Sequence, residues 1–253
     1  MAAGRLLLVP TPLDHGCETT VPLADVLPAG TIAAAAGLTH WICENAKSAR
    51  AFLKRVGELR PLAAPLQQQQ IAELPRAVHK KGDHAPAAFD ARPLLQAAQQ
   101  GADVGLLSEA GMPAIADPGS SVVRAAHDLG LQVVPLVGPV SLLLALAASG
   151  LNGQNFAFVG YLPQEPGPRG QRLHELEALA WRTGQAQLFI ETPYRNLALW
   201  QALLQGLKPD TRLAVASALT LPEAYCRSAP VAVWKKDAAP VGNDRPAVFA
   251  IGP

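Results

Sequence analysis

The sequence predicts an α/β protein of two domains, a parallel sheet with flanking helices followed by an α+β domain with a mixed sheet. In the first half, short apolar runs alternate with helical stretches, a spacing that is typical of right-handed crossovers in a parallel sheet. In the second half, apolar runs follow one another with fewer helices between them. A chain of 253 residues is long enough for two modest domains, which we expect at 1–137 and 138–253.

The first domain begins with two apolar runs that predict strands. Arg5–Val9 (RLLLV) is followed by Pro-Thr-Pro, which is typical of a buried parallel strand that ends in a rigid loop. His40–Cys43 (HWIC) predicts the second strand, and residues 46–56 predict a helix with basic residues on one face. The polar and proline-rich stretch 60–90 is expected to be loop-rich around one weak strand.

The rest of this domain repeats the alternation of helix and strand. The expected elements are a helix over 92–100, a strand over 103–107, a helix from Pro118 to Leu129 and a strand over 131–137. Asp117 is predicted to cap the second of these helices, with Pro118 at its first position, and a ligand contact is the alternative role for Asp117.

The second domain is expected to open with a short apolar helix over 140–149. After it, the apolar runs predict strands over 156–161, 187–190, 212–216, 229–234 and 247–251.

The composition narrows the choice of partners. Only 16% of the residues are charged, against roughly 25% in an average soluble protein, and the formal net charge is +1. Such a chain has no global field for nucleic acid or membrane, so a polyanion would need a local patch. The three cysteines are far apart and the histidines form no HxxxH pair, so no metal site is expected. The longest apolar runs are too short to cross a bilayer, which predicts a cytoplasmic protein without a membrane partner.

Three loops at the predicted carboxyl ends of strands are the places where a ligand is expected. They are Pro10–Leu13, Ser108–Gly119 and Gly138–Ser141. The first strand ends without the glycine-rich turn of dinucleotide-binding folds, which argues against a nucleotide site of that kind.

The residues of these loops carry a resemblance. The segments LLSEAGMPAIADPG (106–119) and VVPLVGPVS (133–141) resemble the S-D-A-G-x-P-x-x-x-D-P-G and V-x-P-x-P-G-P signatures of the tetrapyrrole methylase superfamily. Four more segments, in order along the chain, are similar to the ribosomal RNA small subunit methyltransferase I branch: LVPTPL (8–13), CENAKS (43–48), FVGYLP (158–163) and FIETPYR (189–195).

The resemblance implies a two-domain tetrapyrrole-methylase-like fold, a homodimer, and S-adenosylmethionine in a cleft between the domains. The acceptor would be the ribose 2′-hydroxyl of a cytidine in the 16S rRNA of the small ribosomal subunit. The residues that would bind the cofactor are Ser108, Glu109, Ala110, Gly111, Pro113 and Ile115 on the second loop, Val140 and Ser141 on the third, and Tyr161, Leu162, Glu191, Pro246 and Ala247 in the second domain.

Two residues after the HWIC strand match the branch's A-E-D-T-R motif and are the catalytic candidates. A hydroxyl is a poor nucleophile until a base takes or orients its proton, and Glu44 is expected to do this. Lys47 is expected to contact a phosphate or the substrate. A structural alternative is that Glu44 pairs with Lys47 on a solvated helix start. The basic helix face, with Lys47, Arg50, Lys54 and Arg55, is the best candidate for a local RNA patch.

Departures from the branch's pattern leave the acceptor open. Glu109 stands where the branch has aspartate, and residues 14–18 replace its G-N-L-x-D loop. The branch also has a K-G-E motif before its last strand, and residues 243–246 replace that motif here. The alternatives are therefore a methyltransferase of the same superfamily acting on a tetrapyrrole or another small molecule, and a non-catalytic paralogue that binds the cofactor.

Overall fold

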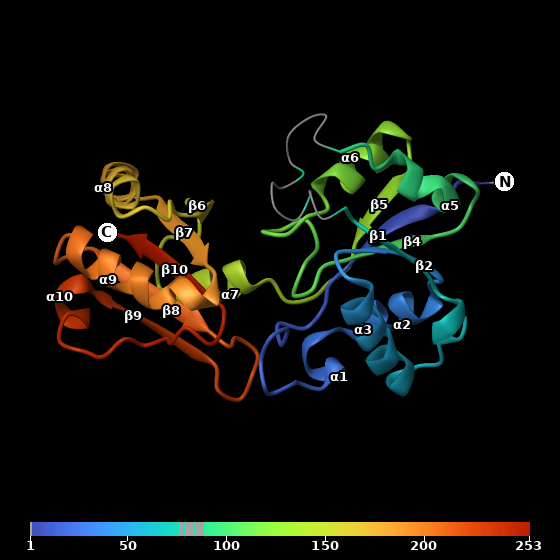
Figure 1. Ribbon diagram of the computed structural model, residues 1–253, viewed down its shortest axis with the longest axis horizontal. Coiled ribbons are helices and arrows are strands. Elements are labelled where there is room, and N and C mark those ends of the chain that lie inside the picture. Colours follow the sequence, from blue (N-terminus) through green and yellow to red (C-terminus); the bar gives the residue numbers. More distant parts are fainter. Residues whose placement is uncertain (1, 76–77, 79–82, 84–88) are drawn as a thin grey trace. The chain divides into compact units, whose positions relative to one another are not determined.

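The structure is a computed structural model that describes residues 2–75, 78, 83 and 89–253 (Figure 1). The chain divides into two compact units. The first unit comprises Met1–His15 and Val21–Val140, and the second comprises Gly16–Thr20 and Ser141–Pro253. The division after Val140 lies three residues beyond the expected boundary, and a short N-terminal segment belongs to the second unit.

The first unit contains a five-stranded sheet in the order β3-β2-β4-β1-β5, in which all strands are parallel. Its strands are β1 (Arg5–Val9), β2 (His40–Cys43), β3 (Gln70–Glu73), β4 (Val104–Leu107) and β5 (Gln132–Pro135). The parallel sheet predicted from the sequence is therefore confirmed.

Helices cover both faces of this sheet, and successive side chains of a strand alternate between two cores. Leu7 and Val9 of β1 pack on one face, whereas Leu6 packs on the other. One face carries α1 (Leu23–Val26), α2 (Ala29–Gly37) and α3 (Ala46–Leu59), and the other carries the 3-10 helix η2 (Arg92–Leu95), α5 (Gln96–Gln99) and α6 (Ser120–Asp128) (Figure 1). Because both faces are buried, the inner strands β1, β2 and β4 are mostly apolar runs that are visible in the sequence.

The start of α6 differs from the expectation. The helix begins at Ser120, and Gly119, with φ of 137°, occupies the cap position. The carboxylate of Asp83 accepts hydrogen bonds from the backbone N–H groups of Gly119 (2.9 Å) and Ser121 (2.8 Å) and from the Ser121 hydroxyl (2.6 Å). The predicted cap by Asp117 is therefore wrong, because a residue distant in sequence supplies the capping carboxylate.

The region expected to be loop-rich contains the 3-10 helix η1 (Leu66–Gln68) and the strand β3. The single weak strand predicted there is confirmed. The part of that stretch at residues 76–77, 79–82 and 84–88 lies outside the described residues.

The second unit contains a mixed five-stranded sheet in the order β6-β7-β10-β8-β9. Its strands are β6 (Phe156–Tyr161), β7 (Ala186–Glu191), β8 (Arg212–Ser217), β9 (Tyr225–Pro230) and β10 (Ala247–Gly252). β6 and β7 are parallel, and the other neighbours are antiparallel, so the predicted mixed sheet is confirmed.

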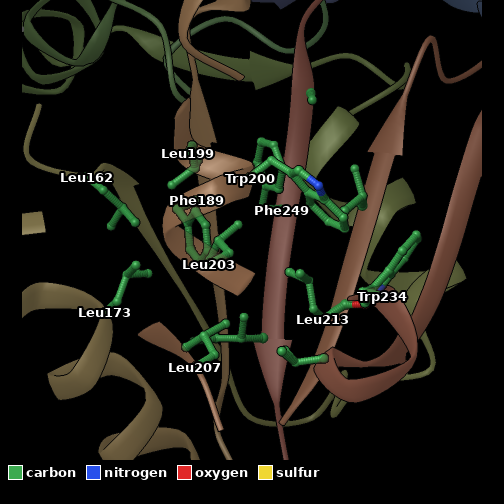
Figure 2. Packing of buried hydrophobic residues seen from close by; sticks show 14 of the residues in the cluster. Leu162, Leu173, Phe189, Leu199, Trp200, Leu203, Leu207, Leu213, Trp234 and Phe249 are labelled. Carbon is green, nitrogen blue, oxygen red and sulfur yellow. The ribbon is translucent and has the colours of Figure 1, made fainter. Parts of the chain in front are cut away.

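The core of this unit lies between the sheet and two long helices (Figure 2). The helices of the unit are α7 (Ser141–Ser149), α8 (Pro166–Thr183), the 3-10 helix η3 (Pro193–Arg195), α9 (Asn196–Gly206) and α10 (Val231–Trp234). The rings of Phe189 and Phe249 stack with their centroids 6.0 Å apart, and Trp200 and Trp234 meet edge to face at 5.1 Å. Leu173 of α8 and Leu203 of α9 complete the contact with the sheet.

One expectation for the second unit is wrong. Residues 229–234 do not form one strand, because β9 ends at Pro230 and the chain continues as the short helix α10. That turn places Val231 and Trp234 on the same side, and both are fully buried.

Candidate active site

The candidate site lies at the carboxyl edge of the parallel sheet. β4 lies between β2 and β1, and the connections that leave β1 and β4 run in opposite directions, which is where open α/β sheets bind ligands. Val9 and Cys43 both align with Leu107 in the sheet register. The residues that follow these strands, among them Glu44 and Ser108, therefore emerge side by side.

A cavity of about 120 Å³ opens between these strand ends. Of the residues expected from the sequence, it brings together Glu44, Ser108 and Glu109. The other polar residues that line it are Thr11, Asp14, His15, Ser48 and Arg55. Thr11 lies in an expected ligand loop and Arg55 was expected on the basic helix face, whereas no role was predicted for the other three.

Hydrogen bonds fix the two glutamates relative to each other. The backbone N–H of Glu109 donates to Glu44 Oε1 at 3.3 Å, and the Ser48 hydroxyl donates to Glu109 Oε1 at 3.1 Å. His15 Nε2 lies 3.5 Å from Glu109 Oε2. Glu44 is therefore oriented by the loop after β4, in the wall of the cavity.

Lys47 lies elsewhere on the same segment. Its backbone N–H is capped by Asn45 Oδ1 at 2.9 Å, and its side chain is exposed on the first turn of α3 rather than in the lining of the cavity. Lys47, Arg50 and Lys54 remain on the exposed basic face. Arg55 leaves that face, because its guanidinium forms an ion pair with Asp14 at 3.0 Å.

Asp117 joins the glutamates, as its alternative role of a ligand contact predicted, instead of capping the helix. The pKa of this carboxyl is raised to about 7, by burial first and by the charges of Glu44 and Glu109, while a hydrogen bond from Ser108 acts in the opposite direction. The site thus holds three neighbouring carboxyl groups, one of which exchanges its proton near neutral pH. The D-P-G segment of the resemblance was the signal that could have identified it.

The loop from Ser108 to Gly119 contains backbone strain. Ala114 (φ 64°) and Ala116 (φ 65°) adopt the left-handed conformation, which costs an alanine roughly 1–2 kcal/mol. Such conformations persist where surrounding structure imposes them, and they are frequent at functional sites.

Gly111, in the same loop, has φ of 74° and exchanges two backbone hydrogen bonds with Thr11, at 2.9 and 3.1 Å. A Cβ atom at Gly111 would lie 3.1 Å from Leu13 Cδ2 and 3.3 Å from the Pro139 carbonyl oxygen. The missing side chain therefore allows this loop to pack closely against the loops that follow β1 and β5.

Other residues expected to bind the cofactor do not line the same cavity. Pro113 and Ile115 line a second, more open cavity of about 470 Å³, together with Met112 and Arg124. The carbonyl of Ala110 accepts a hydrogen bond from the Ser108 hydroxyl at 3.3 Å. Val140 is the last residue of the first unit, and Ser141 begins α7 in the second.

In the second unit, the expected residues lie at the same end of neighbouring strands of the sheet. Ala247 pairs with Glu191 in the register of β10 and β7, and the Pro246 carbonyl accepts a hydrogen bond from Ser217 at 2.8 Å. Glu191 is buried, and its Oε1 accepts two hydrogen bonds from the Arg195 guanidinium, at 2.9 and 2.7 Å.

Tyr161 and Leu162, also expected at the cofactor, differ in their surroundings. Tyr161 is exposed, whereas Leu162 is buried in the hydrophobic core of the second unit (Figure 2). The side chain of Leu162 is therefore committed to packing, and only its backbone is available to a ligand.

The remaining chemistry of the site is narrow. Burial raises the pKa of the Cys43 thiol, in the wall of the cavity, to about 12, so this thiol stays protonated near neutral pH. The described residues contain no group of three or more histidine, cysteine, aspartate or glutamate side chains that could hold a metal ion.

Among the helices that the structure describes, none combines the length and the apolar character needed to cross a membrane.

A comparison with family models decides the family. The model for Tetrapyrrole (Corrin/Porphyrin) Methylases matches residues 24–232. The chain belongs to this family. Solved structures of tetrapyrrole methylases share its fold: the methyltransferase CobJ has a TM-score of 0.58 at 18% identity, over 99% of this chain and 94% of that one. Uroporphyrin-III-C-methyltransferase from Thermus thermophilus has a TM-score of 0.51 at 17% identity, over 98% and 92%.

Within the tetrapyrrole methylases, the chain resembles one named group. It is 33% identical, over 215 residues, to the "Ribosomal RNA small subunit methyltransferase I" of Mesorhizobium japonicum, an alignment of 85% of this chain and 63% of the relative. It is 30% identical over 232 residues to the protein of the same name from Pseudomonas aeruginosa, over 92% of this chain and 72% of the relative. The chain thus spans somewhat less than two thirds of the Mesorhizobium protein. These relatives confirm the branch that the sequence motifs indicated.

Proposed function

We propose that this tetrapyrrole methylase transfers a methyl group from S-adenosylmethionine to the ribose 2′-hydroxyl of a cytidine in the RNA of the small ribosomal subunit. The observation that carries the proposal is the match of 85% and 92% of the chain to two enzymes named for methylation of that RNA. S-adenosylmethionine is the methyl donor, and a related Thermus thermophilus structure was solved in complex with S-adenyl homocysteine.

The carboxyl groups of the first unit are suited to bind the cationic part of this cofactor. The carboxyl groups of Glu44, Glu109 and Asp117 form a cluster of negative charge, and S-adenosylmethionine carries a cationic sulfonium and an ammonium group. The cavity of about 120 Å³ is small beside the roughly 300–1,000 Å³ of sites for drug-sized ligands. It therefore fits only a portion of the cofactor, and the expected cofactor residues of the second unit remain part of this proposal.

The residues of the chain would then act by position and charge. When bound, the cofactor supplies an activated methyl group on its sulfonium. Glu44, held by the Glu109 backbone N–H, accepts the proton of the acceptor hydroxyl or orients that hydroxyl for attack. Deprotonated Asp117 places a further negative charge near Glu44. Lys47, exposed at the start of α3, is the proposed contact for a phosphate of the RNA.

Mass spectrometry of nucleosides from 16S rRNA tests the acceptor. In a strain that lacks this gene we expect the 2′-O-methylcytidine signal to fall, and we expect the wild-type gene, but not Glu44→Gln, to restore it. An unchanged signal in the deletion strain contradicts the RNA acceptor. Titration calorimetry with S-adenosylmethionine tests the cofactor separately, and absence of binding at millimolar ligand contradicts the methyltransferase itself.

The oligomeric state and the cellular location belong to the same proposal. We infer a homodimer, as the resemblance implied, and light scattering after size-exclusion chromatography tests it: a mass near 26.5 kDa at micromolar concentration contradicts the dimer. An acceptor in ribosomal RNA would also place the protein in the cytoplasm.

A further inference from the structure

A groove in the second unit contains none of the residues assigned to cofactor or catalysis. It lies between α8 and α9 and has a volume of about 330 Å³. Its lining is Pro166, Arg169 and Gly170 from α8, and Ala198, Gln201, Ala202, Gln205 and Gly206 from α9. The small residues leave the space between the helices open.

Arg169 is the charged side chain of this groove, and its environment is unusual. Only 9% of the residue is exposed, and its buried Nε has no hydrogen-bond partner among the described residues. Within the same part of the chain, no carboxylate lies at ion-pair distance from its guanidinium. Buried charges are normally paired, so a guanidinium in this position favours an anion from outside the chain.

The neighbouring polar side chains are suited to the same anion. Gln201 and Gln205 lie one turn apart on α9, and both line the groove with amide groups that can donate hydrogen bonds. The groove lining contains no acidic residue that would repel an anion. A planar guanidinium fork with adjacent amide donors matches the tetrahedral oxygens of a phosphate group.

We propose that the α8–α9 groove binds a phosphate group, and that the backbone of the RNA acceptor supplies it. This inference rests on the proposed function for the source of the phosphate, because free inorganic phosphate offers the same oxygens. In a chain with a net charge of +1, RNA affinity needs local contacts, and a preformed site for one phosphate is such a contact.

Kinetics with small ribosomal subunits that lack the modification test the RNA source. For Arg169→Gln we expect KM for the subunits to rise about tenfold at unchanged kcat, since a charged hydrogen-bond partner is lost. The dependence of log(kcat/KM) on log salt should flatten by about 0.7–0.9, as for one lost phosphate contact. Arg169→Lys, which retains the charge, should recover part of the affinity.

Arg172→Gln is the matched control. Arg172 lies on the same helix, but it is exposed and paired with Glu175 at 3.1 Å. Replacement of Arg172 should change both KM and the slope of log(kcat/KM) against log salt by less than twofold. If Arg169→Gln and Arg172→Gln raised KM equally, the helix would contribute only non-specific positive charge, and this result would overturn the proposal. The melting temperature of Arg169→Gln should equal or exceed that of the wild type, because the variant removes an unpaired buried charge.

Titration with inorganic phosphate tests the groove without RNA. In ¹H–¹⁵N spectra, the Arg169 Nε–H resonance should shift saturably, and Gln201→Ala with Gln205→Ala should weaken that binding. A phosphate-induced shift with unchanged KM would assign the groove to a free anion and overturn the RNA source. Absence of any shift would overturn the site. If the wild-type protein binds cofactor but does not methylate subunits, the proposed function fails, and the phosphate titration alone decides the groove.

Discussion

Three carboxyl groups, from Glu44, Glu109 and Asp117, lie together at the edge of the first sheet, and the charges of Glu44 and Glu109 raise the energy of ionising Asp117. Glu44 and Glu109 were expected from the sequence because both lie in segments that resemble motifs of the family. For Asp117 a helix cap was favoured over a ligand contact, because the left-handed conformations of Ala114 and Ala116 in the same loop cannot be anticipated from their side chains.

Replacing Glu44 by Gln should abolish turnover while cofactor binding persists. The amide keeps an oxygen for the Glu109 N–H but cannot accept the proton of the acceptor hydroxyl, so kcat should fall about 10²–10⁴-fold. Methyl transfer from labelled S-adenosylmethionine to unmodified small subunits measures this. Glu58→Gln, an exposed carboxylate of α3, is the control and should keep full activity. Normal turnover in Glu44→Gln would leave Glu44 with a structural role only.

Asp117 should make both stability and activity depend on pH. Its pKa is raised from 3.8 to about 7, so between these values the folded state holds a proton that the unfolded state has lost. The stability that this proton confers is complete below about pH 4 and is lost as the pH rises through about 7. Asp117→Asn lacks this loss, so its melting temperature relative to the wild type should increase from pH 4 to 7 and then level off.

The raised pKa of the Asp117 carboxyl also predicts how the rate of methyl transfer depends on pH. In the wild type, kcat should rise with pH through about 7, as Asp117 loses its proton beside Glu44, and Asp117→Asn should lack that inflection. A variant that retains the wild-type inflection would show that another group controls the rate.

At the scale of elements, strands were predicted better than helix ends. β1, β2 and β6 have the expected bounds, because each is a local run of mostly apolar residues. The start of α6 was missed, since its cap comes from Asp83, far away in the sequence. The run 229–234 alternates like a strand, but Pro230 ends β9 and a helical turn buries Trp234 instead.

Asp83→Asn should destabilise the first unit by weakening the cap of α6. Burial by itself would raise the pKa of Asp83, but hydrogen bonds from Ser121 and Gly119 outweigh it and lower the pKa. The lowered pKa stabilises the fold above the ordinary aspartate range, and that stability is lost as the pH falls. We expect a loss of about 1–2 kcal/mol at pH 7, measured by urea unfolding, which shrinks toward low pH.

Asp90→Asn is the control for this variant. Asp90 is exposed and pairs with Arg92 two residues later, so it connects no distant segments. Its replacement should leave the unfolding midpoint unchanged. Equal midpoints for Asp83→Asn and the wild type would contradict the capping role.

The whole molecule combines two units, each with its own hydrophobic core, and a charge close to zero. The family, the parallel sheet and the mixed sheet were accessible from the sequence, because they depend on motifs and apolar runs. The grouping of Glu191, Pro246 and Ala247 at one end of the strands was not evident from the sequence, because it depends on the position of β10 between β7 and β8.

S-adenosylhomocysteine should raise the melting temperature of the intact protein. At about 100 times its dissociation constant, a ligand of the folded state adds about 2.7 kcal/mol, which corresponds to roughly 5–10 °C in a chain of this size. Differential scanning fluorimetry measures the shift. Gly111→Val should lose it, because a side chain there meets Leu13 and Pro139 and distorts the loop. A wild-type protein whose melting temperature does not respond would contradict the cofactor assignment.

The strand order of the first sheet also has a consequence for synthesis on the ribosome. β1 pairs only with β4 and β5, so it has no neighbour until residues 104–107 have emerged. At translation rates of about 5–20 residues per second, this run of leucines and valine stays unpaired for roughly 5–20 s. Until β4 arrives, the nascent chain therefore presents an apolar strand that chaperones can bind and other chains can capture.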